Sequence, residues 1–137
     1  MTPAPEPHPP APARGRTPTP LVVAASLVVV EAILLVLQGV AEVVAVSGDR
    51  LAMGVTTTLF FLAYGGGLAF CARAMNRLHS WARAPIVVAQ LIQLAVAWSF
   101  WGGSTWPVAL GLALLAVLVL AGIFHPASID ALGDDAG

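Results

Sequence analysis

Four long apolar runs, separated by short clusters of charged residues, Gly, Ser and Pro, dominate the chain after residue 20. They cover residues 21–46, 51–72, 84–101 and 107–124. A helix rises about 1.5 Å per residue and the hydrocarbon core of a bilayer is about 30 Å thick, so each run can cross it or nearly so. None of the runs shows the alternation of a barrel strand. The pattern therefore predicts an all-α fold, an integral membrane bundle of four transmembrane helices.

Composition agrees with this prediction. Of the 137 residues, 58% are hydrophobic and only 9% are charged, whereas a soluble domain carries about 25% charged residues to hydrate its surface. The formal net charge of −1 lacks the basic excess of a nucleic-acid-binding protein, so no nucleic-acid partner is expected. The single Cys71 permits no internal disulfide and no paired-cysteine metal site. We expect no metal and no cofactor.

The two ends of the chain differ in character from the apolar runs. Residues 1–20 hold eight of the eleven prolines and are expected to form a disordered, proline-rich cytoplasmic tail. Residues 21–125 are expected to form the four-helix transmembrane domain, and residues 126–137 a short acidic cytoplasmic tail. The first apolar run is much longer than the roughly 7–15 residues of a secretory signal core, so this helix is expected to be retained.

The arginines predict the orientation. Five of the six lie before the first helix or between the second and third, and only Arg50 lies in a loop on the other side. Cytoplasmic loops carry the excess of basic residues, so both termini and the loop between the second and third helices are expected in the cytoplasm. In that loop Arg73, Arg77, Trp81 and Arg83 are expected to anchor the protein against anionic lipid headgroups.

Glu31 is the most informative residue, because it lies ten residues into the first helix, near the middle of the bilayer, where an ionised side chain is costly. At 100° per residue, Gln38 and Glu42 each lie about 20° from the direction of Glu31. The three residues therefore form one stripe, which is expected to face protein and not lipid. Glu42 is closer to the outer interface, where it can reach water or Arg50.

Counting residues from the ends of the helices gives the partners of this stripe. Tyr64 and Gln90 fall at the depth of Glu31, and Gln93 lies slightly further out on the same side of its helix as Gln90. Nearer the outside, Thr57 and Thr58 fall at the depth of Gln38. We therefore expect a membrane-embedded polar seam between the first three helices, with the fourth packing through Ala and Gly.

Two interpretations of Glu31 stay open. It can be a protonated carboxylic acid that hydrogen-bonds between helices and contributes about 1 kcal/mol per bond. Alternatively, it can bind a proton and a substrate in turn. The second interpretation requires a homodimer with two Glu31 side chains lining one cavity.

The residues Ser80-Trp81-Ala82-Arg83-Ala84-Pro85-Ile86-Val87-Val88-Ala89-Gln90-Leu91, followed by Ala95-Val96-Ala97-Trp98, His125-Pro126-Ala127 and Ala131-Leu132, carry a resemblance. Over about residues 21–132 the chain resembles short four-helix integral membrane proteins of actinobacteria. That family has no assigned activity, so the resemblance implies only the topology and a bacterial inner-membrane location. The chain is also similar to small multidrug resistance transporters, which have four helices and a membrane-embedded glutamate in the first of them. Here Glu31 takes that place. The residues after Glu31, Ala32-Ile33-Leu34-Leu35, and the glutamines of the third helix depart from their pattern.

The sequence offers no constellation of catalytic groups, and its loops are too short for a soluble catalytic domain. We therefore expect a non-enzymatic structural or accessory membrane component whose partners are the lipid bilayer and either further copies of itself or another membrane protein. The alternative is a small proton-coupled transporter that uses Glu31. A lipid-modifying enzyme ranks below both.

Overall fold

The computed structural model of the chain describes residues 2–7 and 16–133. The described part is helical with no strand: the long helices are α1 (Thr19–Ala45), α2 (Leu51–Asn76), α3 (Arg83–Ser99) and α4 (Trp106–Ile123), joined by the short 3-10 turns η1 (Gly48–Arg50) and η2 (Ser80–Ala82) and followed by α5 (Pro126–Gly133). Four helical segments, of 27, 29, 20 and 18 residues including the 3-10 turns, are long and apolar enough to cross a membrane. The all-α fold with four candidate spans is therefore confirmed.

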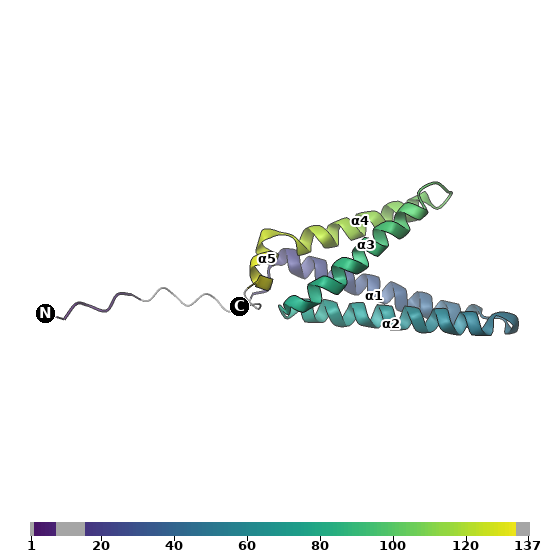
Figure 1. The fold of residues 1–137 in the computed structure, drawn as a ribbon, viewed down its shortest axis with the longest axis horizontal. Helices are drawn as coiled ribbons and strands as arrows, with labels where there is room; N and C mark the ends of the chain where they lie inside the picture. The colour runs from purple at the N-terminus through teal and green to yellow at the C-terminus, as the bar shows by residue number, and fades with distance from the viewer. Residues whose placement is uncertain (1, 8–15, 134–137) are drawn as a thin grey trace.

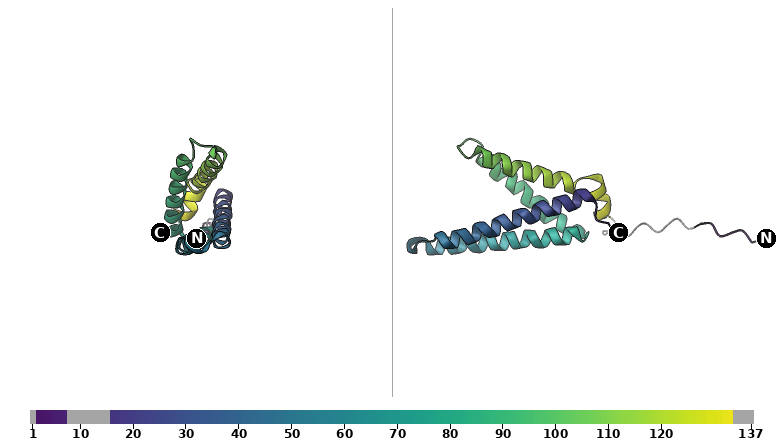
Figure 2. Two further views of the ribbon diagram at one scale, coloured as in Figure 1. Left: turned by 90° about the vertical axis from the view of Figure 1, so that its right-hand side faces the viewer. Right: turned by 180° about the vertical axis from the view of Figure 1, so that it is seen from behind.

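The four long helices form two hairpins arranged as a V (Figure 1). The α1–α2 hairpin and the α3–α4 hairpin meet near the start of α1 and diverge toward the α1–α2 turn and the α3–α4 loop, as the view from behind also shows (Figure 2). α5 lies at the closed end of the V. The ends of α2 and α4 and the starts of α1 and α3 are thus gathered at one end of the molecule.

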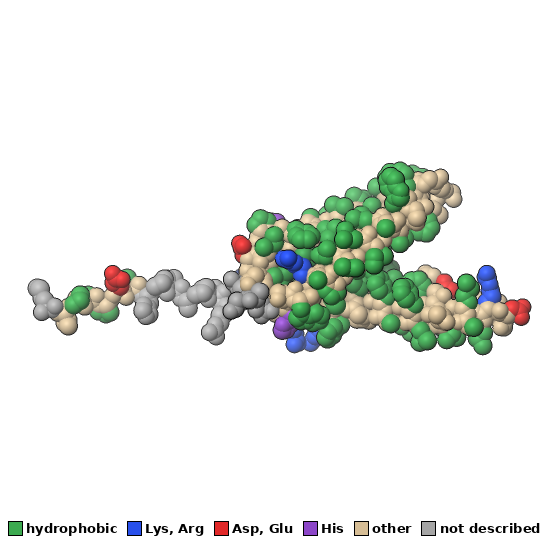
Figure 3. All heavy atoms as spheres, in the orientation of Figure 1, with side chains coloured by type: hydrophobic (Ala, Val, Ile, Leu, Met, Phe, Trp, Pro, Cys, Tyr) green, Lys and Arg blue, Asp and Glu red, His purple; other side chains and the backbone are tan. Residues whose placement is uncertain are grey.

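The hydrophobic core is concentrated at this closed end. Its members come from all five α-helices, and fully buried examples are Leu21, Val28, Met75, Ile86 and Ile123. Most other large apolar side chains along the four spans are exposed (Figure 3). A protein in water hides such side chains, whereas lipid tails solvate them, so this distribution is that of a membrane-embedded bundle.

Close approach between helices depends on two glycines in particular. A Cβ added at Gly65 of α2 would lie 3.0 Å from the backbone oxygen of Ala32 in α1, and one added at Gly122 of α4 would lie 2.7 Å from that of Pro20. The next two residues of α2, Gly66 and Gly67, have no such role, because a Cβ added at either would meet open space.

The N-terminal boundary of the first helix is earlier than expected. α1 begins at Thr19, so Thr19 and Pro20 belong to the helix and not to the proline-rich tail. Proline suits the first helical positions, since its fixed φ is already helical and the missing N–H has no partner there. Residues 2–7 and 16–18 form neither helix nor strand, and the rest of the expected disordered tail lies outside the described residues.

The helix α5 was not expected in the acidic tail. Pro126 starts it, the backbone N–H of Ala127 donates to His125 Nδ1 at 3.2 Å, and the Ser128 hydroxyl donates to the Gly122 oxygen at 2.6 Å. Ser128 and Leu132, four residues apart, are buried on one face. α5 therefore folds back on the closed end of the bundle, with Asp130 exposed. Asp134 and Asp135 lie outside the described residues.

Candidate functional site

The Glu31 carboxyl group is buried where the two hairpins begin to diverge. Its residue is 4% exposed, and both carboxyl oxygens accept hydrogen bonds from α3: Gln90 Nε2 donates to Oε2 at 2.7 Å, and Gln93 Nε2 donates to Oε1 at 3.2 Å. Gln90 and Gln93 are three residues apart and therefore lie on one side of their helix. The cluster formed by Glu31, Gln90 and Gln93 is called the carboxyl–amide cluster below.

Gln93 extends this cluster to the fourth helix. The same Nε2 atom also donates to the backbone oxygen of Leu112 at 3.0 Å. The carboxyl–amide cluster thus links α1, α3 and α4, and α4 takes part without a polar side chain. Sequence patterns cannot reveal this contact, since any residue type carries a backbone oxygen.

A groove of about 440 Å³ opens beside Glu31 and is lined by residues of all four long helices. Glu31, Tyr64 and Gln93 supply its polar groups, and the other walls are aliphatic or aromatic. The rings of Phe60 and Tyr64 are stacked, with centroids 5.7 Å apart. The chain has no lysine, and no arginine lines the groove, so Glu31 faces only neutral groups there.

One acceptor in the carboxyl–amide cluster is unused. Gln90 is fully buried, and its Oε1 atom has no hydrogen-bond partner within the described residues. A buried polar atom without a partner is costly. A protonated carboxyl group would bring a donor into this cluster, whereas an ionised one only accepts.

The outer polar residues form a separate group and do not continue the expected seam. Gln38 is exposed and donates from Nε2 to Glu42 Oε1 at 3.1 Å, and Thr58 Oγ1 donates to the Gly39 backbone oxygen at 3.2 Å. Because the α3–α4 hairpin has diverged at this level, none of the described helices covers Gln38. Within this chain, Glu31 therefore faces another helix, whereas Gln38 does not.

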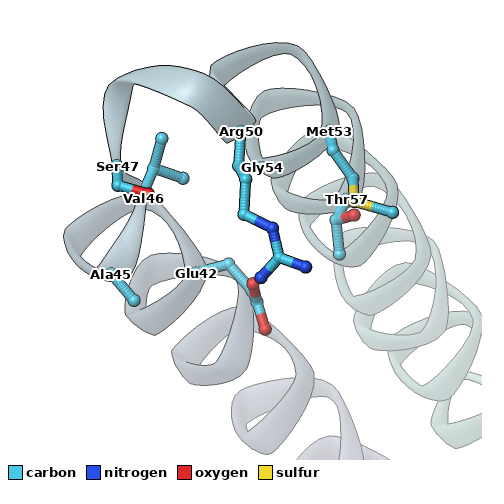
Figure 4. Close-up of a pocket in the computed structure, with 8 residues that line it drawn as sticks. All are labelled: Glu42, Ala45, Val46, Ser47, Arg50, Met53, Gly54 and Thr57. Carbon is cyan, nitrogen blue, oxygen red and sulfur yellow. The ribbon is translucent and has the colours of Figure 1, made fainter.

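A second hollow, of about 240 Å³, lies between α1 and α2 next to the turn that joins them. Glu42 and Thr57 line it together with Arg50 and Gly54. Figure 4 shows the Arg50 side chain pointing toward Glu42. Thr57 therefore lines the hollow beside Glu42 and not the groove beside Glu31. Unlike the groove, this hollow has an arginine, Arg50, among its lining residues.

The expected headgroup anchors also separate into two places. Arg73, Arg77 and Trp81 line a hollow of about 170 Å³ at the end of α2. Arg83, the first residue of α3, instead lies with its guanidinium carbon 5.8 Å from the centre of the Phe124 ring. Its charge is used for a cation–π contact between the start of α3 and the end of α4.

Phe60 and Phe61 are aromatic residues of the groove that were not predicted from the sequence. With Tyr64 they lie within five residues of α2, and the i, i+4 spacing of Phe60 and Tyr64 would have placed both on one face. Within residues 2–7 and 16–133, no three His, Cys, Asp or Glu side chains come close enough together to hold a metal ion. The chemistry available in the groove is hydrogen bonding and proton exchange at one carboxyl group within an apolar surround.

No protein-family model, no curated protein and no solved structure matches this chain. Both resemblances therefore stay predictions.

Proposed function

We propose that the chain is a non-enzymatic component of the bacterial inner membrane, with both termini in the cytoplasm. The described arginines support this orientation, since Arg16, Arg73, Arg77 and Arg83 belong to segments that meet at the closed end of the V and Arg50 belongs to the opposite end. An excess of arginine on the cytoplasmic side is the strongest orientation signal in membrane proteins.

The observation that carries the proposal is the use made of Glu31. Both of its carboxyl oxygens are bound by amides of α3, and Gln93 passes the connection on to α4. The hydrogen bonds join one hairpin to the other at the point where they separate. Polar side chains within a bilayer commonly serve as such interhelical links, so the carboxyl–amide cluster acts as a structural tie.

An accessory or self-associating role follows from the surface that the tie leaves open. Beyond the cluster the hairpins diverge, and Gln38 is exposed at a depth where lipid offers no hydrogen bonds. An amide in that position is stabilised by a polar group from another transmembrane helix. The chain is therefore an element that assembles with a membrane protein or with further copies of itself.

Purification of the tagged chain from its native membrane in a mild detergent tests this proposal. We expect a complex of fixed stoichiometry, either homo-oligomeric or with a second membrane protein, that a Gln38→Leu variant weakens. Val40, which is exposed on the face of α1 opposite the polar stripe, supplies the matched control Val40→Leu. A monomeric protein without a partner, or hydrolytic or transfer activity of the pure chain, would overturn the proposal.

The groove beside Glu31 favours a second candidate, a small proton-coupled transporter. An apolar groove of about 440 Å³ with one carboxyl group and a stacked aromatic pair has the composition of a site for a lipophilic cation. In liposomes with an imposed pH gradient, transport would appear as proton-linked flux of such a cation that Glu31→Gln abolishes while the protein stays folded. Absence of flux, or flux unchanged by Glu31→Gln, excludes this candidate.

A further inference from the structure

The end of α2 and the turn that follows it carry a basic hollow that the structural tie does not involve. Six residues line this hollow of about 170 Å³: Phe70, Arg73, Ala74, Arg77, His79 and Trp81. None of them is acidic. The side chains of arginine and histidine gather on the lower edge of the closed end in Figure 3.

The arginines belong to the regular part of α2 and to its cap. Arg73 and Arg77 are four residues apart, so they project from one face, and both are exposed. Basic groups at a helix C-terminus also interact favourably with the helix dipole. That interaction accounts for their position but leaves their hydrogen-bond donors directed at solvent or at a ligand.

A strained turn fixes the other side of the hollow. Leu78 has a φ of 64°, a left-handed conformation that glycine adopts easily and leucine does not. The N–H of Leu78 donates to the Met75 oxygen at 2.9 Å and that of His79 to the Ala74 oxygen at 3.0 Å. This pair of hydrogen bonds defines a Schellman cap. This cap reverses the chain and places His79 and Trp81 beside the arginines.

The hollow also lies at a defined depth. It falls between the end of one candidate span, Gly48–Asn76, and the start of the next, Ser80–Ser99, and therefore at a membrane interface. The ring of Trp81 lies 5.8 Å from that of Phe70, and both side chains are more than half exposed. Exposed aromatic rings at this level contact the acyl chains and the glycerol region.

We propose that this hollow binds the phosphodiester headgroup of an anionic phospholipid. Two guanidinium groups match the oxygens of a phosphate in pairs, His79 adds a third nitrogen donor, and the Phe70–Trp81 pair lies against the acyl chains. The volume is below the roughly 300–1,000 Å³ of pockets for drug-sized ligands and suits a single headgroup. Arg83 has no part in the site, because it lies over Phe124.

Native mass spectrometry of the full chain in detergent, titrated with phosphatidylglycerol or phosphatidylcholine, tests the proposal. We expect phosphatidylglycerol to bind about tenfold or more tightly than phosphatidylcholine, and the double variant Arg73→Gln/Arg77→Gln to lose this preference. The matched control Arg83→Gln removes one charge of the same loop and keeps the preference. Equal binding of the two lipids, or equal loss in the control, would overturn the site.

Two further arms separate a lipid from a free phosphate and guard against misfolding. Soluble glycerol phosphate, added in excess over the lipid, is expected to leave the bound lipid in place. Displacement of the lipid by glycerol phosphate would contradict a lipid site. Arg77→Lys retains the charge and the fold but not the planar fork. We expect it to weaken phosphatidylglycerol binding several-fold, and unchanged binding in this variant would contradict recognition by the guanidinium group.

Discussion

The hydrogen-bonding capacity of Glu31 is divided between two glutamines of one helix, of which Gln93 also bonds to the Leu112 oxygen and Gln90 depends on Glu31. Gln90 is fully buried, and within the described part of the chain its side chain makes one hydrogen bond, 2.7 Å long, to Glu31. In lipid no water replaces a lost partner. Glu31 therefore provides a buried amide of α3 with a hydrogen-bond acceptor, and in return its own carboxyl oxygens receive hydrogen bonds from α3.

Replacements of Glu31 distinguish hydrogen bonding from charge. Glu31→Gln keeps the shape, and the amide of Gln90 can turn over to offer its unused oxygen, so we expect the free energy of unfolding to fall by no more than about 1 kcal/mol. Glu31→Leu leaves the amide of Gln90 buried without a partner and is expected to cost about 2 kcal/mol. Unfolding in detergent–SDS mixtures measures both. Equal losses for the two variants would contradict the role assigned to the carboxyl oxygens.

The pairing of Glu31 with Gln90 could be predicted from the sequence, because a count of residues from the helix ends gives depth for any antiparallel helices with short loops. Such a count contains no lateral information. It placed Gln38 beside Thr58 by depth, whereas the structure pairs Gln38 with Glu42 and leaves Thr58 on the Gly39 oxygen. The face of α1 on which each residue lies decides this, because Gly39 is buried against α2 whereas its neighbour Gln38 is exposed.

Helix α4 packs on the bundle through one face, which combines small and larger apolar residues. In α4 the buried positions Ala109, Ala116, Val119 and Ile123 follow helical spacing, and Gly122 lets the backbone of α4 approach the start of α1. The predicted packing of the fourth helix through Ala and Gly rests on the same periodicity. α5 was missed because Pro126 and Gly133 suggest loop boundaries, although they equally suit the two ends of a short helix.

Gly122→Ala tests the contact between α4 and α1. Its Cβ would lie 2.7 Å from the Pro20 oxygen and 2.8 Å from Ala24 Cβ. Both distances are too short for a van der Waals contact, so α4 and α1 would have to move apart. We expect unfolding free energy to fall by roughly 1–3 kcal/mol. Gly111→Ala in the same helix meets open space and should leave stability unchanged or slightly higher. The same loss in both variants would show that α4 does not pack on α1 at Gly122.

At the scale of the whole molecule, the V concentrates the core at one end and exposes apolar side chains elsewhere. The proposed orientation makes this closed end cytoplasmic. Single cysteines introduced into a Cys71→Ala background test this orientation. Gly48→Cys and Ser104→Cys lie at the open end, and His79→Cys lies at the closed end. In intact cells, a membrane-impermeant maleimide should label the first two and not the third. The reverse labelling pattern would contradict the orientation.

The central claim is that the Glu31–Gln90 hydrogen bond ties the two hairpins together, and a double-mutant cycle measures this bond most directly. Glu31→Leu and Gln90→Leu each remove one partner of the hydrogen bond and leave the other buried without it. The double variant removes both partners, so neither remains unpaired. We predict that the unfolding free energy of the double variant exceeds the additive expectation by about 1 kcal/mol or more. Additivity within about 0.3 kcal/mol would contradict the structural tie.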